Sequence, residues 1–178
     1  MTLVIRDSTP GDVPTIAAIY GHAVRTGLAS FEYDPPETAE IARRRAAILA
    51  AGYPHMVAAD AFGAVLGYAY VSAYRPRAAY RFTVENSIYV AADAHGRGVG
   101  RILLGALIAR CTEQGFRLMV AVIGDSGNAA SIGLHRACGF IPAGTLPDVG
   151  WKDGRWVDSV LMTRPLGDGA TTPPSAGS

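Results

Sequence analysis

The sequence predicts a mixed α/β domain, and three observations lead to this fold class. Apolar residues alternate along the chain between the period of strands and that of helices, in the order β-α-α-β-β-β-α-β-α-β-β. A glycine-rich turn joins a strand pattern to a helix pattern within Ser87–Gly105. The chain of 178 residues is long enough for one domain with its own core.

The first half of the chain is predicted to contain four strands and two helices, and local features mark some of their ends and faces. Asp12 or a neighbour can cap the first helix, which fades near Gly27. The run Arg43–Arg45 is expected on a solvated helix face, and a basic aromatic loop covers 74–81. The elements predicted up to the glycine-rich turn are a strand at 3–6, helices at 13–26 and 37–51, and strands at 55–59, 64–71 and 82–90.

The second half begins with an amphipathic helix. The continuous apolar run at 118–123 is typical of a fully buried strand. Gly139 can act as the C-terminal cap of the helix predicted at 128–138. The predicted elements are helices at 99–115 and 128–138 and strands at 118–123, 140–146 and 156–162, with a loop at 150–155. From Gly167 the composition turns to Gly, Ala, Thr, Pro and Ser, so we predict a folded domain at 1–166 and a disordered tail at 167–178.

Charge and cysteine content narrow the class of partners. A net charge of +1 gives no electrostatic basis for binding nucleic acid or an anionic membrane, and we expect neither partner. Cys111 and Cys138 lie in helix patterns without metal-ligand spacing, so we predict no metal site and two free thiols in a reducing cytoplasm.

The glycine-rich turn has the layout of an anion-binding loop. Glycine lets the main chain approach a ligand closely, and a helix N-terminus presents unpaired N–H groups. A Walker A loop needs Lys and then Ser or Thr where Arg101–Ile102 stand, and the spacing G-x-G-x-x-G is not met. His95–Gly100 resembles the pyrophosphate loop Arg/Gln-x-x-Gly-x-Gly/Ala of the GCN5-related N-acetyltransferases (GNAT), with His95 in the place of Arg or Gln. A glycine-rich turn that binds no ligand remains the alternative.

Further motifs extend this resemblance over residues 1–166. Asn128–Phe140 resembles the superfamily pattern Asn-x-x-Ala/Ser-x-x-Leu-Tyr-x-x-x-Gly-Phe, with His135 in the place of Tyr. Three segments resemble the phosphinothricin N-acetyltransferase group, which includes methionine sulfone and methionine sulfoximine acetyltransferases: Thr83–Val90, Ala121–Ser126 and Val149–Asp158. The resemblance implies a mostly antiparallel central sheet flanked by helices.

The resemblance also implies a donor and its binding residues. Acetyl-CoA would supply the acetyl group, and CoA would be the product. The pantetheine arm is expected along the strand, the pyrophosphate on the glycine loop, and the polar side chains of the next helix nearby. The cofactor-binding residues predicted in this way are Ile88, Tyr89, Val90, His95, Gly96, Arg97, Gly98, Val99, Gly100, Arg101, Asn128 and Ser131.

Two residues are predicted to move protons. An amine must lose a proton before it attacks a thioester, and an α-amino group has a pKa of about 8, so a modest base suffices. Glu85 shares a strand face with Ser87 and Tyr89, and a carboxylate in mid-strand is costly unless it is hydrogen-bonded or functional. The resemblance implies that Glu85 is this base, directly or through water. His135 would protonate the CoA thiolate, or instead simply pack on a helix face.

The predicted acceptor is a small amino acid or analogue. Arg75 and Arg77 suit carboxylate, phosphinate or sulfone oxygens, while Phe31, Tyr33 and Tyr80 could form walls beside Glu85. The alternatives are an acetyltransferase of protein N-termini or lysines and a non-catalytic acyl-CoA-binding domain. The resemblance further implies a homodimer.

Overall fold

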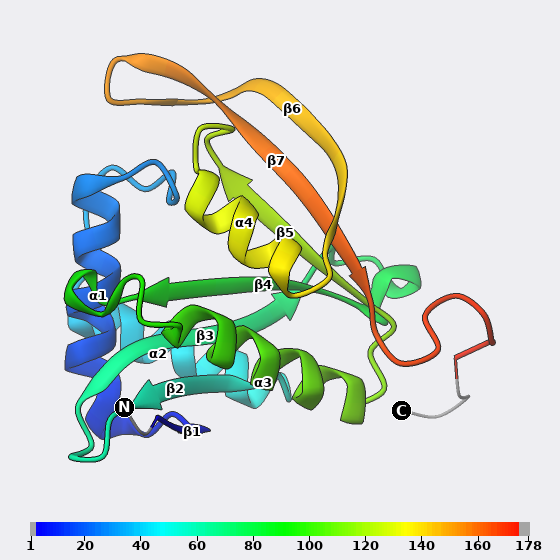
Figure 1. Ribbon diagram of the computed structural model, residues 1–178, viewed down its shortest axis with the longest axis horizontal. Coiled ribbons are helices and arrows are strands. Elements are labelled where there is room, and N and C mark those ends of the chain that lie inside the picture. Colours follow the sequence, from blue (N-terminus) through cyan, green and yellow to red (C-terminus); the bar gives the residue numbers. More distant parts are fainter. Residues whose placement is uncertain (1–2, 175–178) are drawn as a thin grey trace.

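The computed structural model describes residues 3–174, which form a seven-stranded sheet with helices on both faces (Figure 1). The strand order is β1-β2-β3-β4-β5-β7-β6, and β4–β5 is the parallel pair in an otherwise antiparallel sheet. The predicted mixed α/β fold is therefore confirmed. The strands are β1 (Val4–Asp7), β2 (His55–Ala59), β3 (Val65–Ala73), β4 (Thr83–Val90), β5 (Leu118–Gly124), β6 (Ile141–Lys152) and β7 (Arg155–Pro165).

Helices cover both faces of the sheet, and each face has its own apolar core. The four α-helices are α1 (Val13–Thr26), α2 (Thr38–Ala50), α3 (Val99–Glu113) and α4 (Ala129–Ala137). Three short 3-10 turns lie at Pro10–Asp12, Ala78–Tyr80 and Ala92–Ala94. One core lies under α3 and includes Leu103, Leu107 and Met119, whereas the other lies under α1 and α2 and includes Ile16 and Val57.

Sequence-predicted helix ends are only partly those of the structure. Asn128 caps α4, because its Oδ1 accepts the Ser131 N–H at 3.1 Å. Asp12 precedes α1, but its carboxylate binds Arg6 at 2.7 Å and the Thr9 N–H at 2.7 Å instead of the helix amides. The polar cluster around Asp12 therefore fixes the chain before α1.

The parallel pair β4–β5 separates before either strand ends. Pairing runs from Thr83–Leu118 to Asn86–Ala121 and stops there, although β4 continues to Val90 and β5 to Gly124. Figure 1 shows the two strands diverging beyond this point, with α4 beside β5. The divergence leaves a gap in the middle of the sheet.

Three expectations about single elements need correction. Val122 is 40% exposed within β5, because the strand faces the gap there, so the strand is not fully buried. β6 ends at Lys152 and β7 begins at Arg155, so the loop predicted at 150–155 is a two-residue turn at Asp153–Gly154. The arginine run is not simply solvated: Arg44 pairs with Glu32 at 2.6 Å, and Arg45 donates to Ser8 Oγ at 2.7 Å.

The segment after Gly167 differs from the disorder that its composition predicts. Residues 167–174 contain turns, and the Arg117 guanidinium donates to the carbonyls of Gly169 and Thr172 at 2.6 and 2.7 Å. The rest of the predicted tail, 175–178, lies outside the described residues.

Candidate active site

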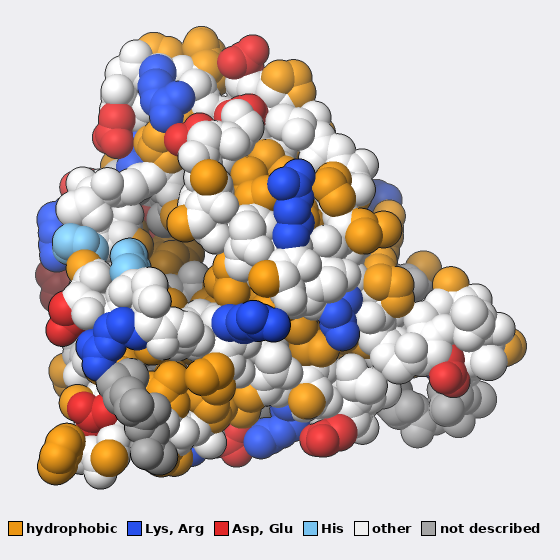
Figure 2. All heavy atoms as spheres, viewed as in Figure 1, with side chains coloured by type: hydrophobic (Ala, Val, Ile, Leu, Met, Phe, Trp, Pro, Cys, Tyr) orange, Lys and Arg blue, Asp and Glu red, His pale blue; other side chains and the backbone are white. Residues whose placement is uncertain are grey.

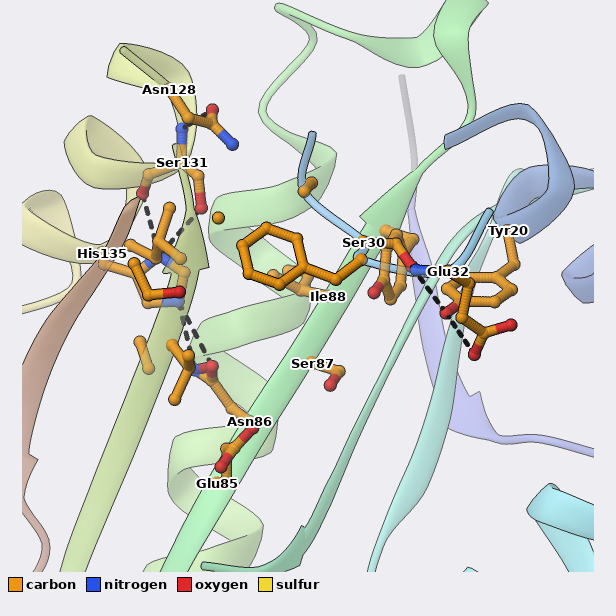
Figure 3. A pocket seen from close by; sticks show the side chains of 18 residues that line it. Tyr20, Ser30, Glu32, Glu85, Asn86, Ser87, Ile88, Asn128, Ser131 and His135 are labelled. Carbon is orange, nitrogen blue, oxygen red and sulfur yellow. Dashed lines mark hydrogen bonds between the residues drawn. The ribbon is translucent and has the colours of Figure 1, made fainter. Parts of the chain in front are cut away.

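Two adjoining hollows lie along the gap between β4 and β5. The first, the carboxylate cavity, has a volume of ≈ 490 Å³ and contains the side chains of Glu32 and Glu85. Figure 3 shows it between the β4 residues, the start of α4 and the segment after α1. It is lined by Tyr20, Ala29, Ser30, Phe31, Glu32, Glu85, Asn86, Ser87, Ile88, Tyr89, Ala121, Val122, Ile123, Gly124, Asn128, Ser131, His135 and Ser159.

The second hollow, the glycine-loop cleft, has a volume of ≈ 550 Å³ and runs from the gap to the start of α3. Eleven of the cofactor-binding residues predicted from the sequence line this cleft: Ile88, Tyr89, Val90, His95, Gly96, Gly98, Val99, Gly100, Arg101, Asn128 and Ser131. Ile88, Tyr89, Asn128 and Ser131 line both hollows, so the two are continuous. Figure 2 shows this face of the molecule hollowed, with histidine side chains at the rim.

The main chain of β4 presents unpaired polar groups to the gap. Ala91 N–H donates to Leu66 O at 2.8 Å and Tyr74 N–H to Thr83 O at 3.4 Å, so odd-numbered β4 residues bond to β3. Even-numbered residues therefore point their N–H and C=O groups toward β5. Beyond Asn86 they find no β5 partner, which leaves Ile88 and Val90 facing the gap, apart from the Val90 carbonyl that accepts from His95 Nε2 at 3.0 Å.

The glycine loop places a helix N-terminus at the far end of the cleft. Gly96 and Gly98 have φ of 71° and 80°, and a Cβ at either position would meet no atom within 4 Å. The first backbone bond of α3 runs from Ile102 N–H to Gly98 O, so earlier amides have no helical acceptor. Positive φ and open space beside orphan amides suit the binding of an anion such as a pyrophosphate. Arg97 is not part of the cleft lining, and its guanidinium donates to Asp93 O at 3.4 Å.

Glu85 lies half-buried on the floor of the carboxylate cavity. Its carboxylate accepts no hydrogen bond from the residues that the structure describes. Burial raises the pKa of the Glu85 carboxyl above its usual value, and the positive charge of Arg75 partly opposes this shift. A carboxylate with a raised pKa and free lone pairs is equipped to accept a proton from a ligand.

His135 lines the carboxylate cavity, but its ring is buried and its Nε2 contacts Asn86. Its Nδ1 lies 2.8 Å from the Ser131 carbonyl, which can only accept, so Nδ1 carries the proton and Nε2 accepts from Asn86 Nδ2 at 3.2 Å. Burial lowers the pKa of His135, so the ring is neutral near pH 7. Figure 3 shows the chain of contacts from Ser131 through His135 to Asn86. This arrangement joins α4 to β4 across the gap.

A second polar cluster borders the cavity on the α1 side. The Tyr20 hydroxyl lies 2.9 Å from Ser30 Oγ and donates to Glu32 at 3.0 Å, and Arg44 binds the same carboxylate. Figure 3 shows Tyr20, Ser30 and Glu32 together opposite α4. The cluster ties the segment after α1 to both α1 and α2.

The predicted acceptor residues are only partly brought together. Phe31 and Glu85 line the carboxylate cavity, but Tyr33, Tyr80 and the two predicted arginines do not. Tyr33 is 67% exposed and donates to Trp151 O at 2.7 Å, and Tyr80 packs edge-on against Tyr74. Arg75 and Arg77 are exposed outside the lining, although Arg75 is close enough to influence Glu85.

Several lining residues have no motif that marks them in the sequence. The sequence pattern indicates core positions for Tyr20 and Val122 and the buried face of a strand for Asn86, and all three line the cavity. A buried tyrosine or asparagine must find a hydrogen-bond partner, which is the signal that singles out Tyr20 and Asn86. The identity of those partners depends on the tertiary fold.

Known proteins with similar sequences and structures are enzymes. A model of the acetyltransferase (GNAT) family matches residues 17–140. Phosphinothricin N-acetyltransferase from Alcaligenes faecalis is 57% identical over 171 residues, 96% of this chain and 85% of that protein. L-methionine sulfoximine/L-methionine sulfone acetyltransferase from Pseudomonas paraeruginosa is 48% identical over 165 residues, 91% of this chain and 94% of that protein. The crystal structure of a GNAT superfamily phosphinothricin acetyltransferase from Sinorhizobium meliloti, in complex with AcCoA, shares 48% identity and a TM-score of 0.95, covering 99% of this chain and 95% of that one.

Proposed function

The chain belongs to the acetyltransferase (GNAT) family, and on that premise we propose that it acetylates the primary amine of a small amino acid or analogue. The donor is acetyl-CoA. The observation that carries this proposal is the continuity of the two hollows, with a proton-accepting carboxylate in one and an anion-binding helix start in the other. The names of the relatives support an acceptor of the phosphinothricin or methionine sulfoximine type.

The residues of the glycine-loop cleft fit acetyl-CoA. Orphan amides at the start of α3 and the exposed side chain of Arg101 suit the pyrophosphate, and Gly96 and Gly98 leave room for it. The unpaired main-chain groups of Ile88 and Val90 suit the amides of the pantetheine arm. Acetyl-CoA supplies the activated acetyl thioester, which would reach the carboxylate cavity along β4.

Glu85 would act as the general base in this proposal. The acceptor amine enters as an ammonium ion at neutral pH and must lose a proton before it attacks the thioester carbonyl. The raised pKa of Glu85 brings its basicity closer to that of an amine, which favours proton transfer, directly or through a water.

The hydrogen bonds of His135 favour a positioning role over that of proton donor. Nε2 accepts from Asn86 and carries no proton, and the Nδ1 proton is held by the Ser131 carbonyl. We therefore propose that His135 orients Asn86 and the start of α4. A proton for the departing sulfur then comes from the acceptor side or from water.

The exposed loop before β4 supports an anionic acceptor. Arg75 lies between β3 and β4, outside the cavity lining, and its positive charge acts on the Glu85 carboxyl. In the bound state Arg75 would pair with the acceptor carboxylate, and Arg77 would add positive charge from the same loop.

We further propose a homodimer in the cytoplasm. β6 is the edge of the sheet, and large apolar side chains stand exposed on the β6–β7 hairpin: Ile141, Leu146, Val149, Trp151 and Trp156. An apolar strip on an unpaired strand edge suits a second copy of the chain. The free thiols of Cys111 and Cys138 support a reducing compartment, and the described residues contain no helix long and apolar enough to cross a membrane.

The direct test is a screen of acceptor amines with acetyl-CoA, followed by release of the CoA thiol. We expect turnover with phosphinothricin, methionine sulfoximine or methionine sulfone, and weak turnover with their amides or decarboxylated analogues. Arg75→Ala should reduce kcat/KM more for acceptors with a free carboxylate than for their amides, because the guanidinium that pairs with the carboxylate is removed. Preferred acetylation of peptide N-termini would support the alternative protein substrate, and acetyl-CoA binding without turnover would indicate a binding domain.

A further inference from the structure

Lys152 is the only lysine in a chain with sixteen lysine and arginine residues, and it is buried. It lies at the end of β6 with 2% of its surface exposed. Its Nζ donates to the carbonyls of Val24 and Gly27 at 2.9 Å and of Ser30 at 2.8 Å. An ammonium has three N–H groups, so these three main-chain acceptors satisfy it fully.

The three acceptors surround the C-terminal end of α1. Val24 lies in the last turn of the helix and Gly27 is its C-cap, so the ammonium also meets the negative end of the helix dipole. Buried cations are costly unless their hydrogen bonds are complete. A guanidinium is planar and carries five N–H groups, so arginine does not match three convergent carbonyls.

The segment that Lys152 holds lines both hollows of the candidate active site. Gly27 and Ala29 line the glycine-loop cleft, whereas Ala29, Ser30 and Phe31 line the carboxylate cavity. Ser30 Oγ also accepts the Glu32 N–H at 3.2 Å and lies 2.9 Å from the Tyr20 hydroxyl. The position of this segment therefore sets the shape of the cavity beside Glu85.

Two glycines make the fit of this segment close. A Cβ on Gly150, two residues before Lys152 in β6, would lie 2.5 Å from Phe31 Cε2. A Cβ on Gly124, the last residue of β5, would overlap the Leu28 carbonyl. Without side chains at Gly124 and Gly150, the segment rests directly on β5 and β6, and Lys152 fastens it there.

We propose that Lys152 is a positioning residue that fixes Gly27–Phe31 as the wall of the acceptor-binding cavity. This inference rests on the proposed function for its kinetic consequences. The wall contributes three consecutive residues, Ala29, Ser30 and Phe31, to the carboxylate cavity. It contributes Gly27 and Ala29 to the glycine-loop cleft, whose other lining residues come from α1, β4, the loop and first residues of α3, and α4. Loss of the ammonium should therefore weaken acceptor binding much more than acetyl-CoA binding.

The kinetic test compares Lys152→Met and Lys152→Arg with the wild-type enzyme and with Arg155→Met. Arg155 is a matched control, since it lies on the same hairpin and pairs with Asp125 at the surface. At a temperature where circular dichroism shows each variant folded, we expect Lys152→Met to raise the acceptor KM about tenfold or more, because small displacements of a site wall are costly. The acetyl-CoA Kd and the kinetics of Arg155→Met should stay near wild type, and Lys152→Arg should restore little.

A purely stabilising lysine would give another pattern. Lys152→Met would then lower the melting temperature, but the folded variant would keep the wild-type acceptor KM, and this result would overturn the proposal. A full rescue by Lys152→Arg would contradict the requirement for three convergent donors.

A labelling experiment tests the same contact without catalysis or mutation. An amine-acylating reagent can modify only Lys152 and the N-terminal amine, and mass spectrometry separates the two products. We expect Lys152 to stay unmodified in the folded wild-type protein and to react once urea unfolds it. Hydrogen exchange in Lys152→Met should rise at residues 27–31 and stay unchanged in α3. Rapid native labelling, or unchanged exchange at 27–31, would sink the proposal even if no acceptor amine were ever turned over.

Discussion

Glu85 is the residue on which the proposed chemistry depends most directly. Its position within the strand partly desolvates the carboxylate, which is unfavourable, and no described side chain compensates by donating a hydrogen bond to it. A group in such surroundings is suited to a ligand that brings its own proton.

Replacement of Glu85 by glutamine should lower kcat about 10²-fold or more, because the amide keeps the shape but accepts no proton from an amine. The acetyl-CoA Kd should change little, since Glu85 does not line the glycine-loop cleft. The deficit should shrink as the pH rises and free amine becomes abundant. A loss that is the same from pH 6 to 9 would point to acceptor positioning and away from proton transfer.

His55 should make the stability of the fold depend on pH. The ring is 3% exposed, and burial together with the charge of Arg45 lowers the pKa of His55 to about 4. Between this value and the unfolded value near 6.5 the unfolded chain binds more protons, so stability falls as the pH drops through that window. The shift corresponds to about 3 kcal/mol once the pH is below both pKa values.

Urea unfolding at pH 7.5 and 4.5 measures this effect in His55→Phe, which keeps a ring between Tyr68 and Tyr70. The variant should lose less stability on acidification than the wild type. His22→Gln, at an exposed helix position, should leave the difference intact. Equal pH dependence in His55→Phe and the wild type would show that other groups dominate.

Residues in local motifs could be predicted from the sequence, and residues held by distant partners could not. The glycine loop follows from spacing within a dozen residues, and strand alternation gives the strand face of Glu85, whereas its role as the base is implied by the family resemblance. Lys152 and the carbonyl of Val24 are 128 positions apart, and nothing in either segment indicates their contact. Tyr33 and Tyr80 are predicted as walls of the acceptor pocket, but an aromatic side chain in a loop can equally pack outside a cavity, as both do here.

At the scale of elements, the start of α3 combines a helix terminus with a left-handed turn. Gly98 is the N-cap of α3 at a φ of 80°, which β-branched residues strongly disfavour. The layout strand, glycine loop and helix was predictable because each part has a local pattern. The divergence of β4 from β5 was not, since strand pairing leaves no periodic signal.

Gly98→Val should raise the acetyl-CoA Kd at least tenfold through strain in the loop and obstruction of its amides. Isothermal titration with CoA measures this directly. Gly105→Ala is a suitable control, because a Cβ there would meet no atom within 4 Å and the position is helical. Wild-type CoA affinity in a folded Gly98→Val variant would remove the loop from the binding site.

At the scale of the whole molecule, the exposed strip on the β6–β7 hairpin should govern assembly. Trp156 is 59% exposed, and Val149 on the neighbouring strand is 51% exposed. Sedimentation at micromolar concentration should show a dimer for the wild type and a monomer for Val149→Asp combined with Trp156→Arg. Phe62→Ser, at a 97% exposed turn outside the strip, should remain dimeric. A monomeric wild type would refute the dimer.

The short parallel ladder between β4 and β5 also has a consequence for the order in which the chain folds. β2, β3 and β4 are consecutive strands that pair with one another, and β6 and β7 form a hairpin next to β5. Within each half of the sheet, most paired strands are therefore neighbours in the sequence. The four residue pairs from Thr83–Leu118 to Asn86–Ala121 join the halves only after the chain has crossed over through α3. Contacts across such a crossover close more slowly than hairpins. On refolding we therefore expect both halves of the sheet to form first, and the β4–β5 ladder, at whose open end we place the proposed thioester site, to form last.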